Sequence, residues 1–403
     1  MYIIRLVPVM LIWTLLGVLG AQAQISDDVV KIGVLADETG VGAAASGPAA
    51  VTAAKLAVED FGGKVAGKPI EVIEADFAEK PDLAASIARS WFDTDKVDAI
   101  ADMPVSSAAL AVQEIARAKK KTMLIGGAVT ATLTGKACSP YSTHWADDSY
   151  VLGSAVAQGM MQGKSDTWFF VAVDYALGAS LQRDATKAIE RLGGKVVGGV
   201  RFPLGAGDFA SFLLQAQASK AKVIGLASVG QDTVNAVKQV HEFGLQAAGQ
   251  SLAAFLVFIT DIDAIGLEGA QGLNVAEGFY WDQNEQSRSF AKRMFAHHHR
   301  MPTKEQAAVY ASVTHYLKAI AAAGTDDSAK VNEQMRRMPV DFFGHAGSIR
   351  PDGRVLYDMT LYQVKSPAES KYPWDYYKAV QTLPKDKIFR PMDAGGCALT
   401  AAK

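Results

Sequence analysis

The chain has 403 residues, which is more than one hydrophobic core usually holds, so the length predicts two domains. Hydrophobic residues make up 49% and charged residues 20% of the chain, a balance typical of a folded soluble protein. The formal net charge is −2, from 40 Lys and Arg against 42 Asp and Glu. Because nucleic-acid binding requires an excess of positive charge, we expect no nucleic-acid partner.

The first 23 residues have the pattern of a secretory signal peptide. A single positive charge at Arg5 is followed by an apolar run and then by Ala21-Gln22-Ala23, a small-residue cleavage site. The alternative is an uncleaved membrane anchor. The apolar run is short for a bilayer span and the cleavage site follows it directly, which favours the signal peptide. We therefore expect residues 1–23 to be removed and the mature protein to be exported and soluble.

After the signal, apolar strand-like segments alternate with helical segments in two successive series. The expected strands of the first series are residues 29–37, 69–77, 97–103 and 122–128, and those of the second are residues 167–175, 195–202, 221–229, 251–260 and 278–282. Short continuous apolar strands separated by helices are typical of parallel βαβ units. The fold class predicted is therefore α/β, with two sheets of comparable size.

The C-terminal third departs from this alternation. It has three helical segments, at about 287–299, 305–323 and 328–337, and then two alternating strands joined by a turn within residues 347–365. Three helices with too few strands for a domain must pack on an earlier sheet. We therefore expect the chain to cross between the lobes near residues 145–150, 280–282 and 347–358. The predicted boundaries are 24–145 with 281–352 for one lobe, and 146–280 with 353–403 for the other.

No motif of catalysis or of cofactor binding is present. The sequence has no P-loop, no G-x-S-x-G elbow and no H-E-x-x-H motif. Three consecutive histidines, His297 to His299, point in different directions on a helix and cannot share one metal ion. We expect neither an enzyme nor a bound cofactor or metal.

Two loops in the first half follow strands directly and carry small or hydroxyl side chains. One contains Ser106 and Ser107, and the other contains Ala128, Val129 and Thr130. In doubly wound sheets, ligands bind beyond the carboxyl ends of the strands, where backbone N–H groups are accessible. Together these loops predict a site that holds a carboxylate through uncharged donors. The alternative for each loop is purely structural, a helix cap for the serines and a turn for the threonine.

The second half contributes different side chains at its strand ends. Tyr175 follows one expected strand, Gly230 lies among small residues after another, and Phe258 ends a third. Aromatic side chains from this half are suited to cover the apolar body of a ligand. Each aromatic taken alone is more often a core residue.

Cys138 and Cys397 are the only cysteines of the chain. An exported protein meets an oxidising compartment, so the pair is a disulfide candidate that would tie the C-terminal tail to the loop after residue 128. The alternative is two free buried thiols.

Several segments resemble the periplasmic leucine/isoleucine/valine-binding proteins, which are type I solute-binding proteins of ATP-driven importers. They are KIGVLADETG, the SSAA loop, GGAVTATLT, DYALG, GDFASFLLQAQASKAKVIGLAS and QVHEFGL. The cysteine pair, HWADD, FYWD and KYPWDYYK are similar to a branch that serves aromatic carboxylates. The resemblance implies two Rossmann-like lobes joined by a three-strand hinge, a ligand trapped by lobe closure, a periplasmic location, a monomeric state and a membrane permease as partner.

The resemblance also assigns roles to single residues. Ser106 or Ser107, Ala128 and Thr130 match the positions that hold the carboxylate of amino acids, and Tyr175 matches an aromatic of the second lobe. Phe258 stands where amino-acid binders have an acid that pairs with the ammonium group.

In the loop of residues 40–48, Ala45 and Ser46 stand where members of this family often have a bulky aromatic residue, which leaves more room for a ligand. These departures predict an aromatic or otherwise apolar monocarboxylate as ligand, of the benzoate or phenylpropenoate type. Asp261 and Asp263 lie close enough to Phe258 in the sequence to pair with an ammonium group in its place, so branched-chain amino acids stay an alternative ligand. An extracellular sensor with the same fold is a second alternative.

Overall fold

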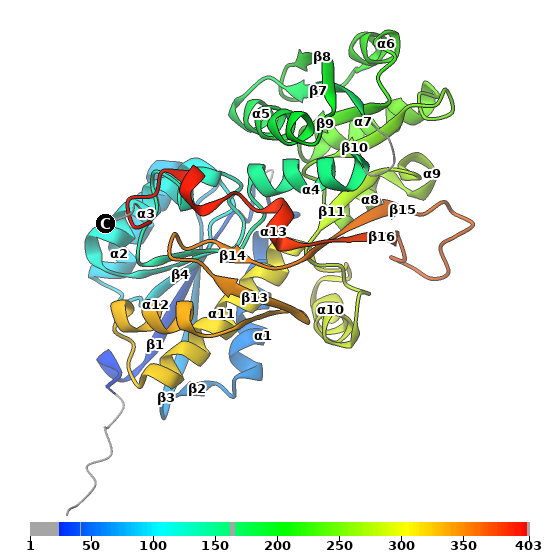
Figure 1. The fold of residues 1–403 in the computed structure, drawn as a ribbon. Helices are drawn as coiled ribbons and strands as arrows, with labels where there is room; N and C mark the ends of the chain where they lie inside the picture. The colour runs from blue at the N-terminus through cyan, green and yellow to red at the C-terminus, as the bar shows by residue number, and fades with distance from the viewer. Residues whose placement is uncertain (1–23, 41, 162–165, 401–403) are drawn as a thin grey trace, which may run out of the picture.

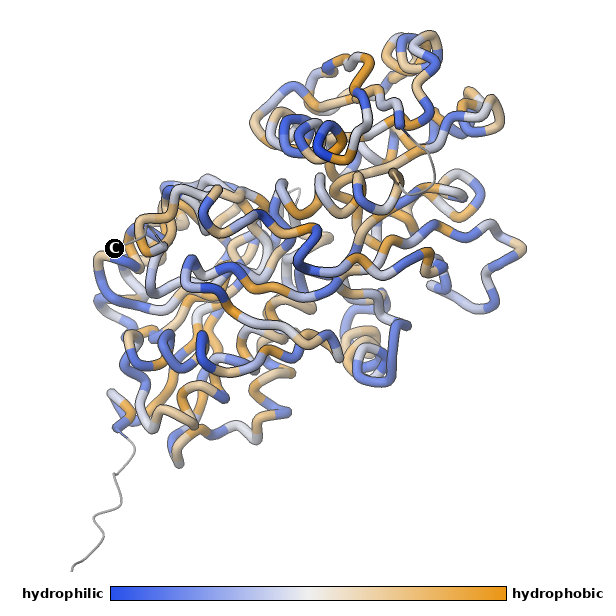
Figure 2. Tube along the Cα trace, viewed as in Figure 1, coloured by the Kyte–Doolittle hydropathy of each residue, from blue (hydrophilic) through white to orange (hydrophobic). Residues whose placement is uncertain are grey.

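The computed structural model describes residues 24–40, 42–161 and 166–400, so the predicted signal peptide lies outside the described residues. The chain forms two lobes, each built around its own sheet (Figure 1). Hydrophobic residues concentrate along the strands and on the helix faces turned toward them (Figure 2). Within the described ranges, no helix is both long and apolar enough to cross a bilayer.

The first lobe contains a six-stranded sheet in the order β2-β3-β1-β4-β5-β6. Its strands are β1 (Val30–Ala36), β2 (Lys64–Val65), β3 (Lys68–Asp76), β4 (Ala99–Asp102), β5 (Thr122–Ile125) and β6 (Ser142–His144). All neighbours pair in parallel except β2 with β3. The neighbouring inner strands β4 and β5 are buried at every position, as expected of parallel strands covered by helices on both faces.

The helices of this lobe are α1 (Gly47–Asp60), α2 (Pro81–Asp93), α3 (Ser106–Lys119), α10 (Glu285–His298), α11 (Lys304–Ala323) and α12 (Ser328–Arg337), of which α10 packs against α1. The helix α11 starts with a capping box, in which Thr303 Oγ1 accepts from the Gln306 amide at 3.3 Å and Gln306 Oε1 accepts from the Thr303 amide at 3.0 Å. It packs against α1, α12 and β4. The helices of the C-terminal third therefore return to the first sheet, as the shortage of strands predicted.

The second lobe contains a seven-stranded sheet in the order β16-β15-β11-β10-β9-β7-β8. The five parallel strands are β7 (Thr167–Val173), β8 (Lys195–Phe202), β9 (Val223–Ala227), β10 (Ser251–Ala254) and β11 (Asn274–Glu277); β15 (Met359–Val364) and β16 (Tyr377–Leu383) add antiparallel to the edge. Its helices are α4 (Ser149–Met161), α5 (Ala176–Arg191), α6 (Ala210–Ala218), α7 (Gln231–Glu242), α8 (Ile259–Ile265), α9 (Leu267–Ala270) and α13 (Lys385–Ile388).

The chain passes between the lobes after β6, after β11 and before β15. The hydroxyl of Tyr357, on the third crossing, lies 3.0 Å from the Trp145 carbonyl oxygen and 2.8 Å from Asp147 Oδ1 on the first, and these two acceptors share its single proton. A Cβ at Gly278, on the second crossing, would lie 2.4 Å from the Tyr357 ring, so only glycine fits there. A small sheet of β12 (Val340–Phe342), β13 (His345–Ile349) and β14 (Val355–Leu356) precedes the third crossing.

The predicted α/β class and two-lobed fold are confirmed, and the lobe boundaries stay predictions. The strand ends differ from expectation in the second lobe. The segment expected as a strand over 251–260 is β10 only to Ala254, and the segment expected over 278–282 is not a strand, because β11 ends at Glu277. Apolar residues continue past both ends because they line the space between the lobes and the crossings, which is buried as well.

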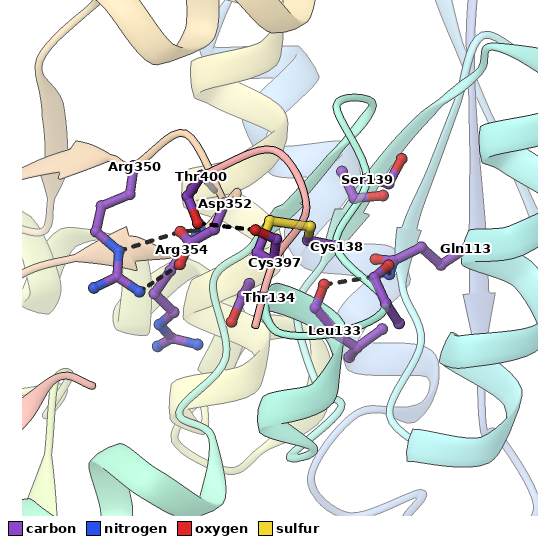
Figure 3. Close-up of a disulfide and its surroundings, with 12 residues drawn as sticks. Gln113, Leu133, Thr134, Cys138, Ser139, Arg350, Asp352, Arg354, Cys397 and Thr400 are labelled. Carbon is purple, nitrogen blue, oxygen red and sulfur yellow. Dashed lines mark hydrogen bonds and ion pairs between the residues drawn. A yellow bond between two sulfur atoms is a disulfide. The ribbon is translucent and has the colours of Figure 1, made fainter. Parts of the chain in front are cut away.

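The C-terminal tail returns from the second lobe to the first. Cys138 and Cys397 form a disulfide with Cα atoms 5.6 Å apart, which confirms the predicted pairing (Figure 3). Arg390 donates to the Ala131 carbonyl at 3.1 Å and to Thr134 Oγ1 at 3.4 Å. The tail from Arg390 onward therefore contacts the first lobe, although the predicted boundaries placed it with the second.

Candidate functional site

The two loops predicted to hold a carboxylate lie side by side at the carboxyl edge of the first sheet. The Asp102 carbonyl at the end of β4 accepts from the Gly126 amide at 2.8 Å and from the Gly127 amide at 3.3 Å. Further along, the Thr130 amide donates to Ser106 Oγ at 3.2 Å. The strand order thus joins the loop after β4 to the loop after β5. We call residues 126–130 the anion loop.

The carbonyl groups of the anion loop are held from behind by the first crossing. His144 Nε2 lies 2.6 Å from the Ala128 carbonyl oxygen, and the Ser149 amide donates to the Val129 carbonyl at 2.9 Å. Burial and the nearby Arg354 lower the pKa of His144 to about 3, so its ring is neutral and carries its one proton on Nε2, facing the carbonyl.

The two amides in the middle of the same loop are not bonded to the protein in this way. The N–H groups of Ala128 and Val129 donate to no acceptor among the described residues. At these two residues the carbonyl groups are bonded inward and the amides are left without acceptors in the described structure, an arrangement suited to bind an anion.

Neither predicted serine caps its helix. The helix α3 begins at Ser106, and the residue in the N-cap position is Val105, which supplies no side-chain hydrogen bond. The proposed alternative, that the serines serve only as a cap, is therefore wrong. Ser106 Oγ accepts from Thr130 and keeps its own proton to donate, and Ser107 is exposed. The helix adds free amides and its positive end to the edge where the anion loop lies.

The remaining first-lobe predictions have different surroundings. Thr130 is partly exposed, and its Oγ1 accepts from the Thr132 amide at 3.3 Å, which leaves the hydroxyl proton available. Ser46 is fully buried, and its hydroxyl donates to Asp102. Ser46 therefore acts inside the first lobe.

In the second lobe, Tyr175 and Gly230 lie at open strand ends. Tyr175 is 40% exposed, and its pKa is raised by burial, by Asp232 and by Glu79 of the first lobe, so it lies within electrostatic reach of the opposite lobe. Gly230 has a φ of +61°, and no described atom lies within 4 Å of the place where its Cβ would be. These residues provide an aromatic face and free space at the ends of β7 and β9.

Phe258 lies against a buried ammonium group. Lys304 Nζ is 5.7 Å from the centre of the Phe258 ring, 3.2 Å from Glu277 Oε2 and 3.6 Å from Asp147 Oδ2. Burial lowers the pKa of Lys304, but Glu277 and Asp147 outweigh burial and raise it, so Lys304 stays charged. The space beside Phe258 and Lys304 is a small cavity of about 10 Å³, which Tyr280 and Tyr377 also line.

Asp261 and Asp263, the two acids considered as partners for a ligand ammonium group, both bind other groups of the protein. Asp261 Oδ2 accepts from the Phe258 amide at 2.9 Å at the start of α8. Asp263 is exposed, and its Oδ1 accepts from the Tyr376 hydroxyl at 2.5 Å.

Sequence reasoning missed four residues that the structure brings to this site: His144, Ser149, Lys304 and Glu305. His144 begins HWADD and Ser149 follows it, next to the expected crossing at 145–150, and this position was the available signal. Lys304 and Glu305 begin a helix far along the chain, and only the return of α11 to the first sheet places them here.

A family model described as a periplasmic binding protein matches residues 29–371 of the chain. The chain belongs to the periplasmic binding protein family. Membership confirms the resemblance found in the sequence and implies a periplasmic location. The proteins of this family and the similar solved structures are solute-binding proteins.

Similar solved structures cover nearly the whole periplasmic binding protein. One from Burkholderia mallei is 46% identical, with 93% of this chain and 99% of that chain covered and a TM-score of 0.86. A branched-chain amino-acid ABC transporter ligand-binding protein from Burkholderia xenovorans is 37% identical, with 92% and 99% covered and a TM-score of 0.88.

A third, from Rhodopseudomonas palustris, was solved in complex with 3,4-dihydroxybenzoic acid. It is 22% identical, with 89% and 98% covered and a TM-score of 0.79, which shows likeness of fold. A search among curated proteins finds no matching relative.

Proposed function

We propose that this periplasmic binding protein captures an aromatic or apolar monocarboxylate between its lobes and delivers it to the membrane permease of an ABC importer. The observation that carries the proposal is the anion loop, where the Ala128 and Val129 amides have no acceptor in the described part of the chain while the carbonyls of the same two residues are bonded inward. With the free proton of Ser106 and the start of α3, these groups supply uncharged donors for a carboxylate.

The surroundings of Phe258 support a ligand without an ammonium group. At this position a ligand ammonium would meet an aromatic ring with the ammonium of Lys304 behind it. Two like charges in a buried site repel strongly, and a cation without a partner is costly to bury. An apolar ring, in contrast, fits the aromatic faces of Phe258 and Tyr175.

Closure of the lobes gives the binding mechanism. The first lobe holds the carboxylate, and contacts from the second lobe stabilise the closed form by no more than the difference in ligand affinity between open and closed forms. The closed form then presents a surface composed of both lobes to the permease.

Branched-chain amino acids are the second candidate. The name of the Burkholderia xenovorans relative, at 37% identity, favours them. Solved neighbours from Rhodopseudomonas palustris with bound hydroxybenzoates favour the aromatic acids, at 22–23% identity.

A thermal-shift screen of the mature protein distinguishes the two candidates, because a ligand that binds only the native state raises the unfolding midpoint. We expect benzoate or 3-phenylpropenoate to raise it, and leucine, valine and the uncharged benzamide to leave it unchanged. A shift with leucine or valine and none with any aromatic acid would overturn the proposal.

A further inference from the structure

Two buried acids lie directly behind the anion loop. The backbone of Asp102 binds the amides of Gly126 and Gly127. Glu305, at the start of α11, approaches from the other side, with Oε2 only 3.2 Å from the place where a Cβ of Gly127 would be. The Glu305 carboxyl group and the Asp102 backbone therefore both adjoin Gly127, and the charge of Asp102 acts on Glu305. We call Asp102 and Glu305 the acid floor.

Each acid of the floor has an oxygen without a partner. Asp102 is 0% exposed and Glu305 is 7% exposed. Asp102 Oδ2 accepts from Ser46, but Asp102 Oδ1 and Glu305 Oε2 have no hydrogen-bond partner in the described structure. Glu305 also lines a small cavity of about 10 Å³ between the crossings, whose wall includes Leu256 of the second lobe. Buried carboxyl oxygens are normally satisfied, so these two point to a missing proton or ligand.

Among the described residues, no unpaired cation acts on either member of this floor. The charged groups that act on its two members from the surrounding elements are Asp37 on Asp102, and Lys304, Asp147 and Asp261 on Glu305. Lys304 is the one cation among them, and it is already paired with Glu277 and Asp147. A carboxylate ligand on the anion loop would add a further negative charge beside two buried acids. Like charges gathered in a buried site oppose one another's ionisation.

We propose that the protein binds its carboxylate ligand together with one proton that the acid floor holds. The proton comes from solvent and forms an O–H bond on Asp102 or Glu305, and the neutral carboxyl group then donates a hydrogen bond that neither acid can give when ionised. This inference rests on the proposed function, because a ligand that carries an ammonium group would need the floor ionised and would bind without proton uptake.

The charge environment supports the direction of the effect. Burial, with a contribution from Asp37, raises the pKa of Asp102 to about 7. Burial and Asp102 raise the pKa of Glu305 well above its usual range. An anion bound above them raises both further, so the bound state holds more protons than the free state above about pH 7. Affinity is therefore full at lower pH and falls as pH rises, by at most about tenfold per pH unit for one proton.

Isothermal titration calorimetry of the mature protein tests this with benzoate or 3-phenylpropenoate, whichever binds. Titrations in two buffers of different ionisation enthalpy give the number of protons taken up, and a pH series gives the slope of affinity. We expect uptake of up to one proton above neutral pH. Glu305→Gln and Asp102→Asn, made separately, should reduce this uptake and flatten the pH dependence.

Asp98→Asn is the matched control. Asp98 is a buried acid that precedes the first residue of β4, at the end of the strand away from the anion loop, and its carboxylate accepts from the Lys31 amide and from Lys121 Nζ. Its proton uptake should equal that of the wild type. Zero uptake by the wild type, or full uptake by both floor variants, would overturn the inference while leaving the proposed function intact. Failure of the proposed function would give a different result, because no aromatic acid would then give a binding signal.

Discussion

The Nε2 atom of His144 lies 2.6 Å from the carbonyl oxygen of Ala128, so the last residue of β6 fixes the carbonyl of the loop that follows β5. With this carbonyl bonded inward, the adjacent amides are left for an anion. The same histidine accepts no proton at neutral pH, because burial and Arg354 hold its pKa at about 3. The interaction is therefore a fixed neutral hydrogen bond.

Replacement of His144 by leucine should weaken ligand binding. The variant leaves the buried Ala128 carbonyl without a donor, which costs about 1–3 kcal/mol and frees the loop to turn. We expect the dissociation constant from calorimetry to rise about tenfold or more. The matched control is His315→Leu, which removes an equally buried bond to the Met335 carbonyl at 2.9 Å away from the loop. An equal loss of affinity in both variants would contradict this role.

Replacement of Thr130 by valine keeps the shape of the side chain and removes the hydroxyl. If the hydroxyl proton binds a buried carboxylate, binding should weaken by about 1–3 kcal/mol. The exposed Thr132, two residues further on, supplies the control Thr132→Val, whose affinity should equal that of the wild type. Unchanged binding by Thr130→Val would remove this hydroxyl from the site.

Replacement of Lys304 by methionine should destabilise the fold. The change leaves Glu277 buried without its cation, which costs about 3–5 kcal/mol, and the second change Glu277→Gln should restore much of this loss. Urea denaturation measures both variants. Lys55→Met breaks the exposed pair with Glu74, which contacts it at 2.8 Å, and should cost no more than about 1 kcal/mol. A similar small cost at Lys304 would show that its charge is not confined between the lobes.

Loss of the disulfide should lower stability without abolishing the fold. Cys138 and Cys397 are separated by 259 residues, and removal of a native disulfide typically costs about 2–5 kcal/mol. We expect Cys138→Ser with Cys397→Ser to unfold at lower urea concentration than the wild type. A reductant should destabilise the wild type to the same level and leave the double variant unchanged. An effect of reductant on the double variant would mean that the reagent acts elsewhere.

The architecture was predictable because it depends on local patterns. Apolar strands between helices predicted both parallel sheets, and the surplus of helices after residue 285 predicted their return to the first sheet. Strand ends were less predictable: residues 255–258 are as apolar as the strand before them, since the space between the lobes buries side chains as a sheet does. Two cysteines allow a single pairing, so the disulfide followed from the export signal.

The candidate site was predictable only on its exposed side. Ser106, Ala128 and Thr130 follow strands directly, and the direction of a parallel sheet places them at one edge. The groups behind them come from other parts of the chain. Lys304 and Glu305 are charged residues, a type that is rarely buried, and only the packing of α11 on β4 buries them. Pairings between distant segments leave no local pattern.

A crystal structure of the mature protein with a ligand from the thermal-shift screen tests the central claim most directly. We predict that the ligand carboxylate lies within hydrogen-bond distance of the Ala128 and Val129 amides and of Ser106 Oγ, with its apolar body against Phe258 and Tyr175. A ligand ammonium group paired with Asp102 or Glu305 would contradict the account.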